Sequence, residues 1–480
     1  MNRRELIAGI SGLGLAASLR PAWAEAPPTL LAVSRRTLEV KGKAASVYGI
    51  TGPDGKPGLD MLLGQRFNVR LRNDIDTDTV VHWHGLTPPY GQDGVAMLGQ
   101  DPIRPGNSFD YDFANLRSGT HWMHSHMGLQ EQQMLAAPLI VRETKEPLFD
   151  TQEHVVLLHD FTFRDPADIL AELTGGKGGH AAHAGMDHSA MDHSAMSADD
   201  MANMQAGMAG AMLNDVAYDA YLANDRTLED PEIVMVEKGG SLRLRIINGA
   251  AASNMWIDLG TLDGELIAVD GNAIHPVPGR VFPLAVAQRA DIRLRVPPQG
   301  GAFPVLFRPE GLAERTGIVL ATPGATVARV AGQGELAPAL DLAQELLYRA
   351  VARPRDEPVN RTEMIMLTGG DANYVWGLNG KSSMHDTIFT VREGERISVM
   401  MHNMTGMAHP MHLHGHYFKI TAIGNTPIDG AVRDVVLVPP MESVTITFDA
   451  DNPGTWAFHC HHLYHMNAGM MGTISYTSAA

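Results

Sequence analysis

The single cysteine of this 480-residue chain, Cys460, lies between His459 and His461. In an extended strand, successive side chains point to opposite faces, so Cys460 would face one side and both histidines the other. His465 follows five residues later and Met470 ten residues later. A thiolate, two imidazoles and a weak methionine are the ligands of a blue-copper electron-transfer site. An inert buried thiol is the alternative, and the surrounding histidines argue against it.

Three further non-overlapping His-x-His pairs occur in the chain: His82-Trp83-His84, His124-Ser125-His126 and His412-Leu413-His414. On a strand, residues i and i+2 share a face at roughly 6–7 Å. This spacing suits two neighbouring metal ions better than one. Together with His459 and His461, the pairs supply eight imidazoles, and His409 stands three residues before His412. The pairs occur only near the two ends of the chain, which predicts that distant segments meet at one metal cluster.

These segments closely resemble the copper-binding segments of the multicopper oxidases, over nearly the whole chain. The resemblance implies four copper ions. It assigns the type 1 copper to His409, Cys460, His465 and Met470, and the type 2 copper to His82 and His412. It assigns one type 3 copper to His84, His124 and His461, and the other to His126, His414 and His459. All twelve positions match the family pattern.

The resemblance also implies a reaction. Electrons enter one at a time at the type 1 copper, pass through Cys460, and reduce O₂ to water at the other three coppers. That chemistry consumes protons, and Asp93 matches the family's acidic residue near the type 2 copper; a turn aspartate is the alternative. Asp434 is a candidate to orient a type 1 ligand or meet substrate, with a plain salt bridge as the alternative. Met466 stands where cuprous-oxidising relatives often carry an acidic residue.

The strand pattern predicts an all-β chain. Polar and apolar residues alternate over 241–246, 291–296 and 444–448, as half-buried strands do. The resemblance implies three cupredoxin-like Greek-key β-sandwich domains. We expect them at 27–150, at 151–340 with an insertion over 175–212, and at 345–480 with the type 1 copper.

The N-terminus has the pattern of an export signal over residues 1–24. Arg3-Arg4 precedes an apolar run, and Ala22-Trp23-Ala24 is typical of a cleavage site. The pattern predicts twin-arginine export to the periplasm; a buried N-terminal helix is the alternative. No later apolar run reaches the length of a membrane span. The net charge of −17 disfavours nucleic-acid binding, and we expect a monomer.

A methionine- and histidine-rich segment interrupts the chain between residues 175 and 212. Its candidate soft-metal ligands are Met186, His188, Met191, His193, Met196, Met201, Met204 and Met208. Thioethers and imidazoles select Cu(I) and Cu(II), so we predict extra labile copper sites on a loop and a short helix over 198–212. A low-complexity linker and a methionine stripe that packs on the protein are the alternatives.

A second group of methionines leads into His409: Met400, Met401, Met404, Met407 and Met411. Some should be core residues, and others could line a substrate route. The leading hypothesis is a cuprous oxidase for copper tolerance that also accepts phenols. The alternatives are a general phenol-oxidising laccase, or a copper-sequestering protein with incidental oxidase activity.

Overall fold

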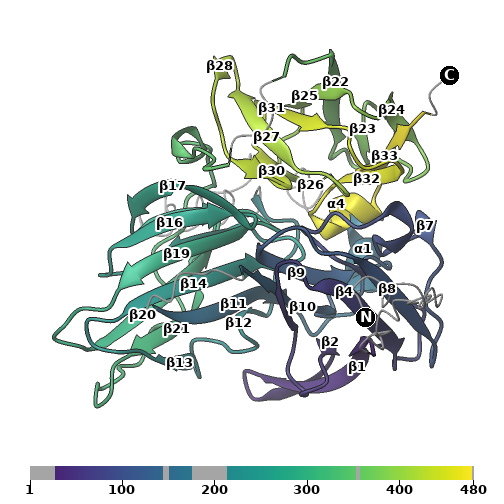
Figure 1. The fold of residues 1–480 in the computed structure, drawn as a ribbon. Helices are drawn as coiled ribbons and strands as arrows, with labels where there is room; N and C mark the ends of the chain where they lie inside the picture. The colour runs from purple at the N-terminus through teal and green to yellow at the C-terminus, as the bar shows by residue number, and fades with distance from the viewer. Residues whose placement is uncertain (1–26, 144–150, 176–212, 353–356, 478–480) are drawn as a thin grey trace, which may run out of the picture.

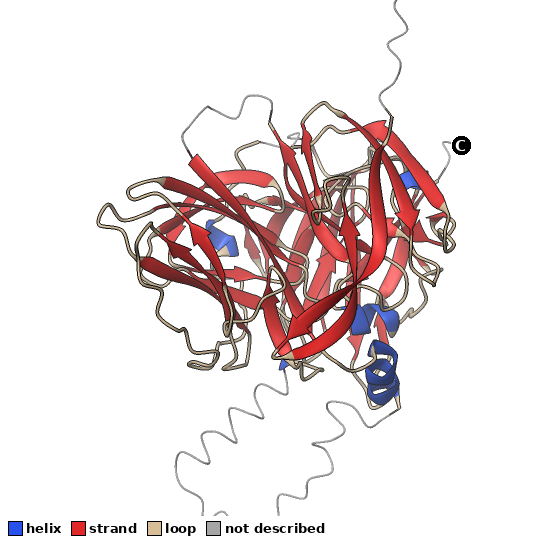
Figure 2. Cartoon of the chain, turned by 90° about the horizontal axis from the view of Figure 1, so that it is seen from below, coloured by secondary structure: helices blue, strands red, loops and turns tan. Residues whose placement is uncertain are grey.

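The computed structural model describes residues 27–143, 151–175, 213–352 and 357–477. Strands dominate these residues, and the helices are few and short (Figure 2). The predicted export signal and residues 176–212 of the methionine- and histidine-rich segment lie outside these ranges. Export and extra copper sites therefore stay predictions. Within the described ranges, no helix combines the length and apolar character needed to cross a membrane.

The N-terminal sandwich consists of two four-stranded sheets. One has the order β2 (Lys43–Thr51), β1 (Thr29–Val40), β4 (Arg66–Asn73), β8 (Ser108–Ala114). The other has the order β3 (Leu59–Leu62), β10 (Ala136–Arg142), β9 (Gly119–Ser125), β5 (Val81–His82). A 3-10 helix η1 (Tyr90–Gln92) and a small pair, β6 (Val95–Ala96) and β7 (Gly99–Gln100), connect them. Strand β4 alternates exposed and buried residues, as expected for a sheet with one face on the core.

The middle sandwich pairs a six-stranded sheet with a five-stranded sheet. The first has the order β12 (Ala220–Ala223), β11 (Thr151–Phe161), β14 (Ser241–Asn248), β19 (Arg289–Arg295), β16 (Gly264–Val269), β17 (Asn272–Gly279). The second has the order β13 (Glu232–Met235), β21 (Thr316–Ala321), β20 (Ala302–Pro309), β15 (Met255–Asp258), β18 (Val281–Leu284). Helix α1 (Pro166–Thr174) begins at Asp165, whose carboxylate accepts from the Ala167 amide, a normal N-cap.

The C-terminal sandwich holds the cysteine. Its outer sheet has the order β23 (Trp376–Leu378), β22 (Arg361–Gly369), β25 (Arg396–Asn403), β31 (Ser443–Asp449), β27 (Phe418–Ile423), β28 (Thr426–Pro427), and β29 (Val432–Arg433) also pairs with β27. Its inner sheet has the order β24 (Thr387–Val391), β33 (Met471–Tyr476), β32 (Thr455–Cys460), β26 (His409–Leu413), β30 (Val435–Val438). Helix α4 (Leu463–Asn467) follows β32, and the 3-10 helix η4 (Glu345–Leu347) precedes the sandwich.

Each sandwich has its own apolar core, and the three meet at a common junction (Figure 1). A small buried cluster at this junction combines residues of all three: Trp122, Ala136, Leu157, Ile247, Val286, Ala287 and Val435. Close packing of this kind fixes the sandwiches relative to one another. The all-β prediction is confirmed, and the strands expected at 241–246, 291–296 and 444–448 lie in β14, β19 and β31.

Candidate metal centre

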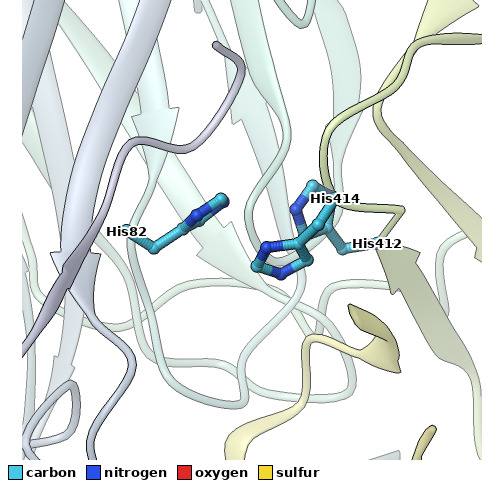
Figure 3. Close-up of side chains that lie close together, drawn as sticks. All are labelled: His82, His412 and His414. Carbon is cyan, nitrogen blue, oxygen red and sulfur yellow. The ribbon is translucent and has the colours of Figure 1, made fainter. Parts of the chain in front are cut away.

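The first histidine of each pair lies on one of two pairs of hydrogen-bonded strands, and the second follows just beyond the end of that strand. In the N-terminal sandwich, His82 on β5 is opposite His124 on β9. In the C-terminal sandwich, His412 on β26 is opposite His459 on β32. Strand β5 is at the edge of its sheet, which brings it to the C-terminal sandwich. Figure 3 shows the result: His82 faces His412 and His414 across the interface.

The eight imidazoles form one buried cluster. Ring centroids within the four His-x-His pairs are 5.6, 6.1, 4.6 and 5.5 Å apart, so each pair does share a face. Ligand atoms of His126, His414 and His459 lie within 4.8 Å of one another, as do those of His82, His412 and His414. These distances are short enough for metal ions to be shared between the two sandwiches.

Hydrogen bonds fix which nitrogen of each ring faces the cluster. Nδ1 of His82 donates to the Asp93 carbonyl (2.9 Å), and Nδ1 of His412 donates to the Asp434 carbonyl (2.8 Å). Because a carbonyl can only accept, Nδ1 carries the hydrogen and Nε2 keeps its lone pair. The buried ring nitrogens of the cluster without a hydrogen-bond partner are Nε2 of His82, His124, His412 and His461 and Nδ1 of His84. This donor set, oriented through its other nitrogens, fits copper.

Burial lowers the pKa of most of these imidazoles. For His459, burial is the largest cause, and neighbouring rings add to it against the raising effect of a hydrogen bond to the Cys460 carbonyl, so that the pKa is about 3. The pKa values of His412 and His461 are also well below the ordinary value, for the same two reasons. Neutral imidazole is the form that binds a metal, so these side chains are ready to bind copper at neutral pH.

Asp93 contacts both sandwiches. Its carbonyl accepts from His82, and its Oδ2 accepts from Nδ1 of His414 at 2.7 Å. The loop reaches this position because Gly94 has φ +82°, and a Cβ there would lie only 1.8 Å from the Val81 carbonyl oxygen. A non-glycine residue would push the loop off β5. The structure therefore places the predicted proton-handling residue at the cluster.

Glu131 is a second carboxylate at the cluster, and no sequence motif singles it out. Its Oε2 lies 2.9 Å from Nδ1 of His124, and its Oε1 lies 3.7 Å from Nδ1 of His461. Burial, followed by the charge of Asp160, raises its pKa well above the ordinary value. The only sequence feature at this position is an acidic residue between two glutamines, five residues after His126.

Cys460 lies on the other side of β32, with His409 and His465. Its Sγ is 3.6 Å from Nδ1 of His409 and 3.8 Å from Nδ1 of His465, and these two nitrogens are 3.2 Å apart. Met470 is buried in the same core, and its amide donates to the His465 carbonyl. Burial raises the pKa of the Cys460 thiol, so a bound metal is needed to stabilise the thiolate.

Several contacts around this site were not predicted. Nε2 of His465 donates to Oδ2 of Asp215 at 2.8 Å, and Nε2 of His409 donates to the Thr405 hydroxyl at 2.8 Å. The ring of His462 stacks on His465 with centroids 3.7 Å apart and an interplanar angle of 5°. The ring of Trp376 packs against the ring of His465, with centroids 4.0 Å apart. These contacts hold the two ligand rings so that both Nδ1 atoms face the sulfur.

Asp434 forms the salt bridge that the sequence analysis gave as the alternative to a role beside the type 1 copper or the substrate. It contacts neither His409 nor His465 in any hydrogen bond of the described residues; its Oδ1 instead accepts from Nε2 of His84 at 3.2 Å. Its carboxylate is paired with the buried guanidinium of Arg289. Burial raises the pKa of Asp434 to about 6, against the lowering effect of Arg289. The residue therefore supports the histidine cluster and the junction of the sandwiches.

The methionines on either side of His409 divide as the sequence suggested. Met401, Met407 and Met411 are buried in the core of the C-terminal sandwich. Met404 is 55% exposed, and Met400 is half-buried on the opposite face of β25 from Met401. Only the outward-facing methionines remain available to a ligand.

Comparison with known proteins identifies the family. Models described as multicopper oxidase match residues 32–146, 153–328 and 356–479, so most of the chain is covered. The chain belongs to the multicopper oxidase family. It is a copper-dependent oxidoreductase in which the buried histidine and cysteine sets are the copper-binding candidates.

Three relatives of this multicopper oxidase cover most of its length. Multicopper oxidase MmcO of Mycobacterium tuberculosis is 30% identical, over 89% of this chain and 82% of that protein. Copper resistance protein A of Escherichia coli is 25% identical, over 92% and 91%. Laccase-4 of Trametes villosa is 24% identical, over 92% and 88%.

The solved structure of a multi-copper oxidase from Pseudomonas thermotolerans has the same fold. The TM-score is 0.70 at 23% identity, and the match covers 93% of this chain and 98% of that chain. The prediction of an all-β fold with three cupredoxin-like sandwiches is therefore confirmed.

Proposed function

We propose that this multicopper oxidase takes single electrons from Cu(I), and also from phenols, and passes them to O₂ in the service of copper tolerance. The observation that carries the oxidase mechanism is the position of Cys460. Its side chain belongs to one donor set, and its two sequence neighbours, His459 and His461, belong to the other. Storage of copper would not need two sites joined in this way, which argues against a sequestering protein.

The proposed ligand sets are those of the family pattern. His409, Cys460, His465 and Met470 would hold the type 1 copper, and His82 and His412 the type 2 copper. His84, His124 and His461 would hold one type 3 copper, and His126, His414 and His459 the other. Bound copper supplies the one-electron redox steps and the site at which oxygen is reduced.

The protein's own groups orient the ligands and handle protons. The Asp93 carboxylate holds the Nδ1 hydrogen of His414 at 2.7 Å, so it can take part in delivering protons next to the cluster. Glu131 orients His124 in the same way, and its other carboxylate oxygen lies 3.7 Å from Nδ1 of His461. Every one of these groups is at most 3% exposed, so bulk water is kept from the reaction except along specific routes.

Two features support Cu(I) as the donor. One relative is a copper resistance protein, and the segment over 176–212 is rich in methionine and histidine, which suit soft metal ions. A general phenol-oxidising laccase is the second candidate, supported by the similarity to Laccase-4. We further propose twin-arginine export to the periplasm and a monomeric enzyme with four coppers.

Oxygen uptake by the copper-loaded enzyme tests this proposal. We expect fast turnover of chelated Cu(I), and turnover of a methoxyphenol that depends on added Cu(II). Cys460→Ser should abolish both the blue colour and turnover. Deletion of residues 180–212 should reduce Cu(I) oxidation and spare phenol oxidation. Fast phenol turnover without added copper, and little with Cu(I), would instead establish a laccase.

A further inference from the structure

Three methionines and one histidine form a patch on the outer face of the C-terminal sandwich. Strands β22 and β25 run parallel, with Met364 opposite Met400 and Met366 opposite His402. Ile365, Met401 and Leu367 between them point into the core. Since side chains alternate along a strand, Met364, Met366, Met400 and His402 share the solvent side. We call these four residues the outer methionine patch.

The patch differs from its surroundings. The neighbouring positions on the same side of these two strands are Thr362, Thr368 and Ser398, which are small polar residues, and Ser398 is buried. Met364 is 56% exposed, and the other three side chains are partly exposed. Single exposed apolar residues are common, but three adjacent thioethers beside an imidazole form a specific donor set.

The geometry of the patch suits one metal ion. Neighbouring strands lie about 4.8 Å apart, and i and i+2 on one strand about 6–7 Å apart. Methionine has three rotatable side-chain bonds and adapts to irregular sites, so sulfurs at this spacing can converge. Nδ1 of His402 is hydrogen-bonded to the Ser443 hydroxyl at 2.8 Å. That bond anchors the ring and leaves Nε2 for a ligand.

We propose that the outer methionine patch is a docking site for Cu(I) substrate. Thioethers and imidazole select Cu(I), while oxygen-preferring cations bind them poorly. Solvent exposure lets the ion arrive and leave, as a substrate must. Each docked Cu(I) would lose one electron, which the type 1 site accepts, and leave as Cu(II). The proposal rests on the proposed cuprous oxidase function and adds a site that lies outside the metal centre.

The patch is connected to the metal centre through β25. After Asn403 the chain continues through Met404, which is 55% exposed, to Thr405, whose hydroxyl lies 2.8 Å from Nε2 of His409. Cys460 lies in the core between the two sheets of this sandwich. An ion on the outer face would therefore be separated from the core that holds Cys460 by the outer sheet of this sandwich.

Binding of Ag(I), a redox-inert substitute for Cu(I), tests the site without turnover. The reduced, copper-loaded enzyme is labelled with ¹³C at the methionine methyl groups and titrated anaerobically. We expect the resonances of Met364, Met366 and Met400 to shift saturably; each is assigned by its loss in a single Met→Leu variant. Met235, 55% exposed on β13 of the middle sandwich, is the matched control and should not shift in this range.

The triple variant Met364→Leu/Met366→Leu/Met400→Leu keeps the volume of the side chains and should fold normally. We expect it to lose about one Ag(I) per chain and to raise KM for Cu(I) by at least about tenfold, the scale of lost metal-site interactions. Phenol oxidation should be unchanged, which reports an intact metal centre.

The outcomes separate the site from the function. If the three methyl signals stay fixed, or shift only when Met235 also shifts, the docking site is wrong. If the methyl signals do not respond but the wild-type enzyme still oxidises Cu(I) well in air, the cuprous oxidase proposal stands without the docking site. If Ag(I) binds the patch but Cu(I) is a poor substrate, the binding site stands and the proposed function fails.

Discussion

Oδ2 of Asp215 lies 2.8 Å from Nε2 of His465, so a carboxylate that precedes the middle sandwich's β12 orients an imidazole of the Cys460 site. The Asp215 side chain is 1% exposed, and the Tyr374 hydroxyl donates to the same oxygen. The contact fixes Nδ1 of His465 toward the sulfur. It also places a negative charge beside the site, which stabilises the more positive, oxidised metal.

Asp215→Asn should therefore raise the reduction potential of the type 1 copper and lower Cu(I) turnover by about 10–100-fold. The potential is measured by redox titration of the blue absorption, and turnover by oxygen uptake. Tyr374→Phe is the control, since it removes a hydrogen bond to Asp215 and keeps the charge. Equal potentials in wild type and Asp215→Asn would show that the carboxylate does not influence the site.

Asp93→Asn should slow the oxygen reaction and spare the electron-accepting site. An amide can still bond to His414 but cannot supply a proton, and loss of a positioned general acid typically costs about 10²-fold or more. Stopped-flow mixing separates the steps: anaerobic bleaching of the blue colour by substrate should keep its rate, and its return on mixing with O₂ should slow. Asp93→Glu should recover part of the rate. Slower bleaching would contradict this role.

Arg289→Met should destabilise the junction of the sandwiches. Arg289 is fully buried, and its guanidinium pairs with both oxygens of Asp434. Removing one partner of a buried pair costs about 3–5 kcal/mol, because the other charge is left uncompensated. The free energy of unfolding, from urea titration, should fall by that amount. The double variant Arg289→Met/Asp434→Asn should recover part of the loss; no recovery would mean that the charge left on Asp434 is not the cause.

The histidine and cysteine positions could be predicted because they follow from strand geometry. Alternation along β32 places Cys460 apart from His459, and the i, i+2 spacing brings each His-x-His pair together. Two supporting carboxylates, those of Asp215 and Glu131, could not be predicted, because packing alone brings them to the site. Asp215 and Glu131 come from elements with no periodic pattern that points to a metal.

Strand register explains why Asp434 lies by the histidine cluster and not by His409. Strand β30 pairs with β26 so that Val435 is opposite His412 and Val438 is opposite His409. Asp434 immediately precedes β30, so it lies at the His412 end of the pairing and toward the histidine cluster. A sequence gives the strands but not this register, and a shift of the pairing by a few residues would have placed the carboxylate by His409 instead.

The copper-free protein should lose stability as the pH falls. In the part of the chain that the structure describes, twelve buried imidazoles have a lowered pKa: those of His84, His121, His124, His126, His159, His409, His412, His414, His416, His459, His461 and His462. Three buried carboxyls, of Glu131, Glu310 and Asp434, have a raised pKa and act in the opposite direction. Because the imidazoles outnumber these carboxyls, they determine that stability decreases as the pH falls.

A group with a lowered pKa in the folded state stabilises above its unfolded pKa, and this stability is lost as the pH falls. For His459 the loss begins near 6.5 and continues to about 3. The midpoint of thermal unfolding of the copper-free protein should fall steadily from pH 7 to pH 4. Copper-loaded protein should resist the same change, because a metal holds the imidazoles neutral. A flat profile for the copper-free protein would contradict the buried, neutral cluster.

Glu131→Gln should weaken one type 3 copper and leave the Cys460 site intact. The two carboxylate oxygens face Nδ1 of His124 and Nδ1 of His461, and both of these nitrogens must carry hydrogen if their Nε2 atoms are to bind metal. An amide offers one oxygen and one NH₂ group, so one imidazole would face a donor instead of an acceptor. Copper affinity should fall by about 10–100-fold at this position.

Copper content, the blue absorption and the electron paramagnetic resonance spectrum check this outcome together. We expect less copper per chain, an unchanged blue absorption, and a new signal from a type 3 copper that has lost its coupled partner. Glu310→Gln is the matched control, because Glu310 is also a buried glutamate with a raised pKa but contacts Asn254 and Leu340. Loss of copper in both variants alike would point to general destabilisation, and retention in both would remove Glu131 from the copper site.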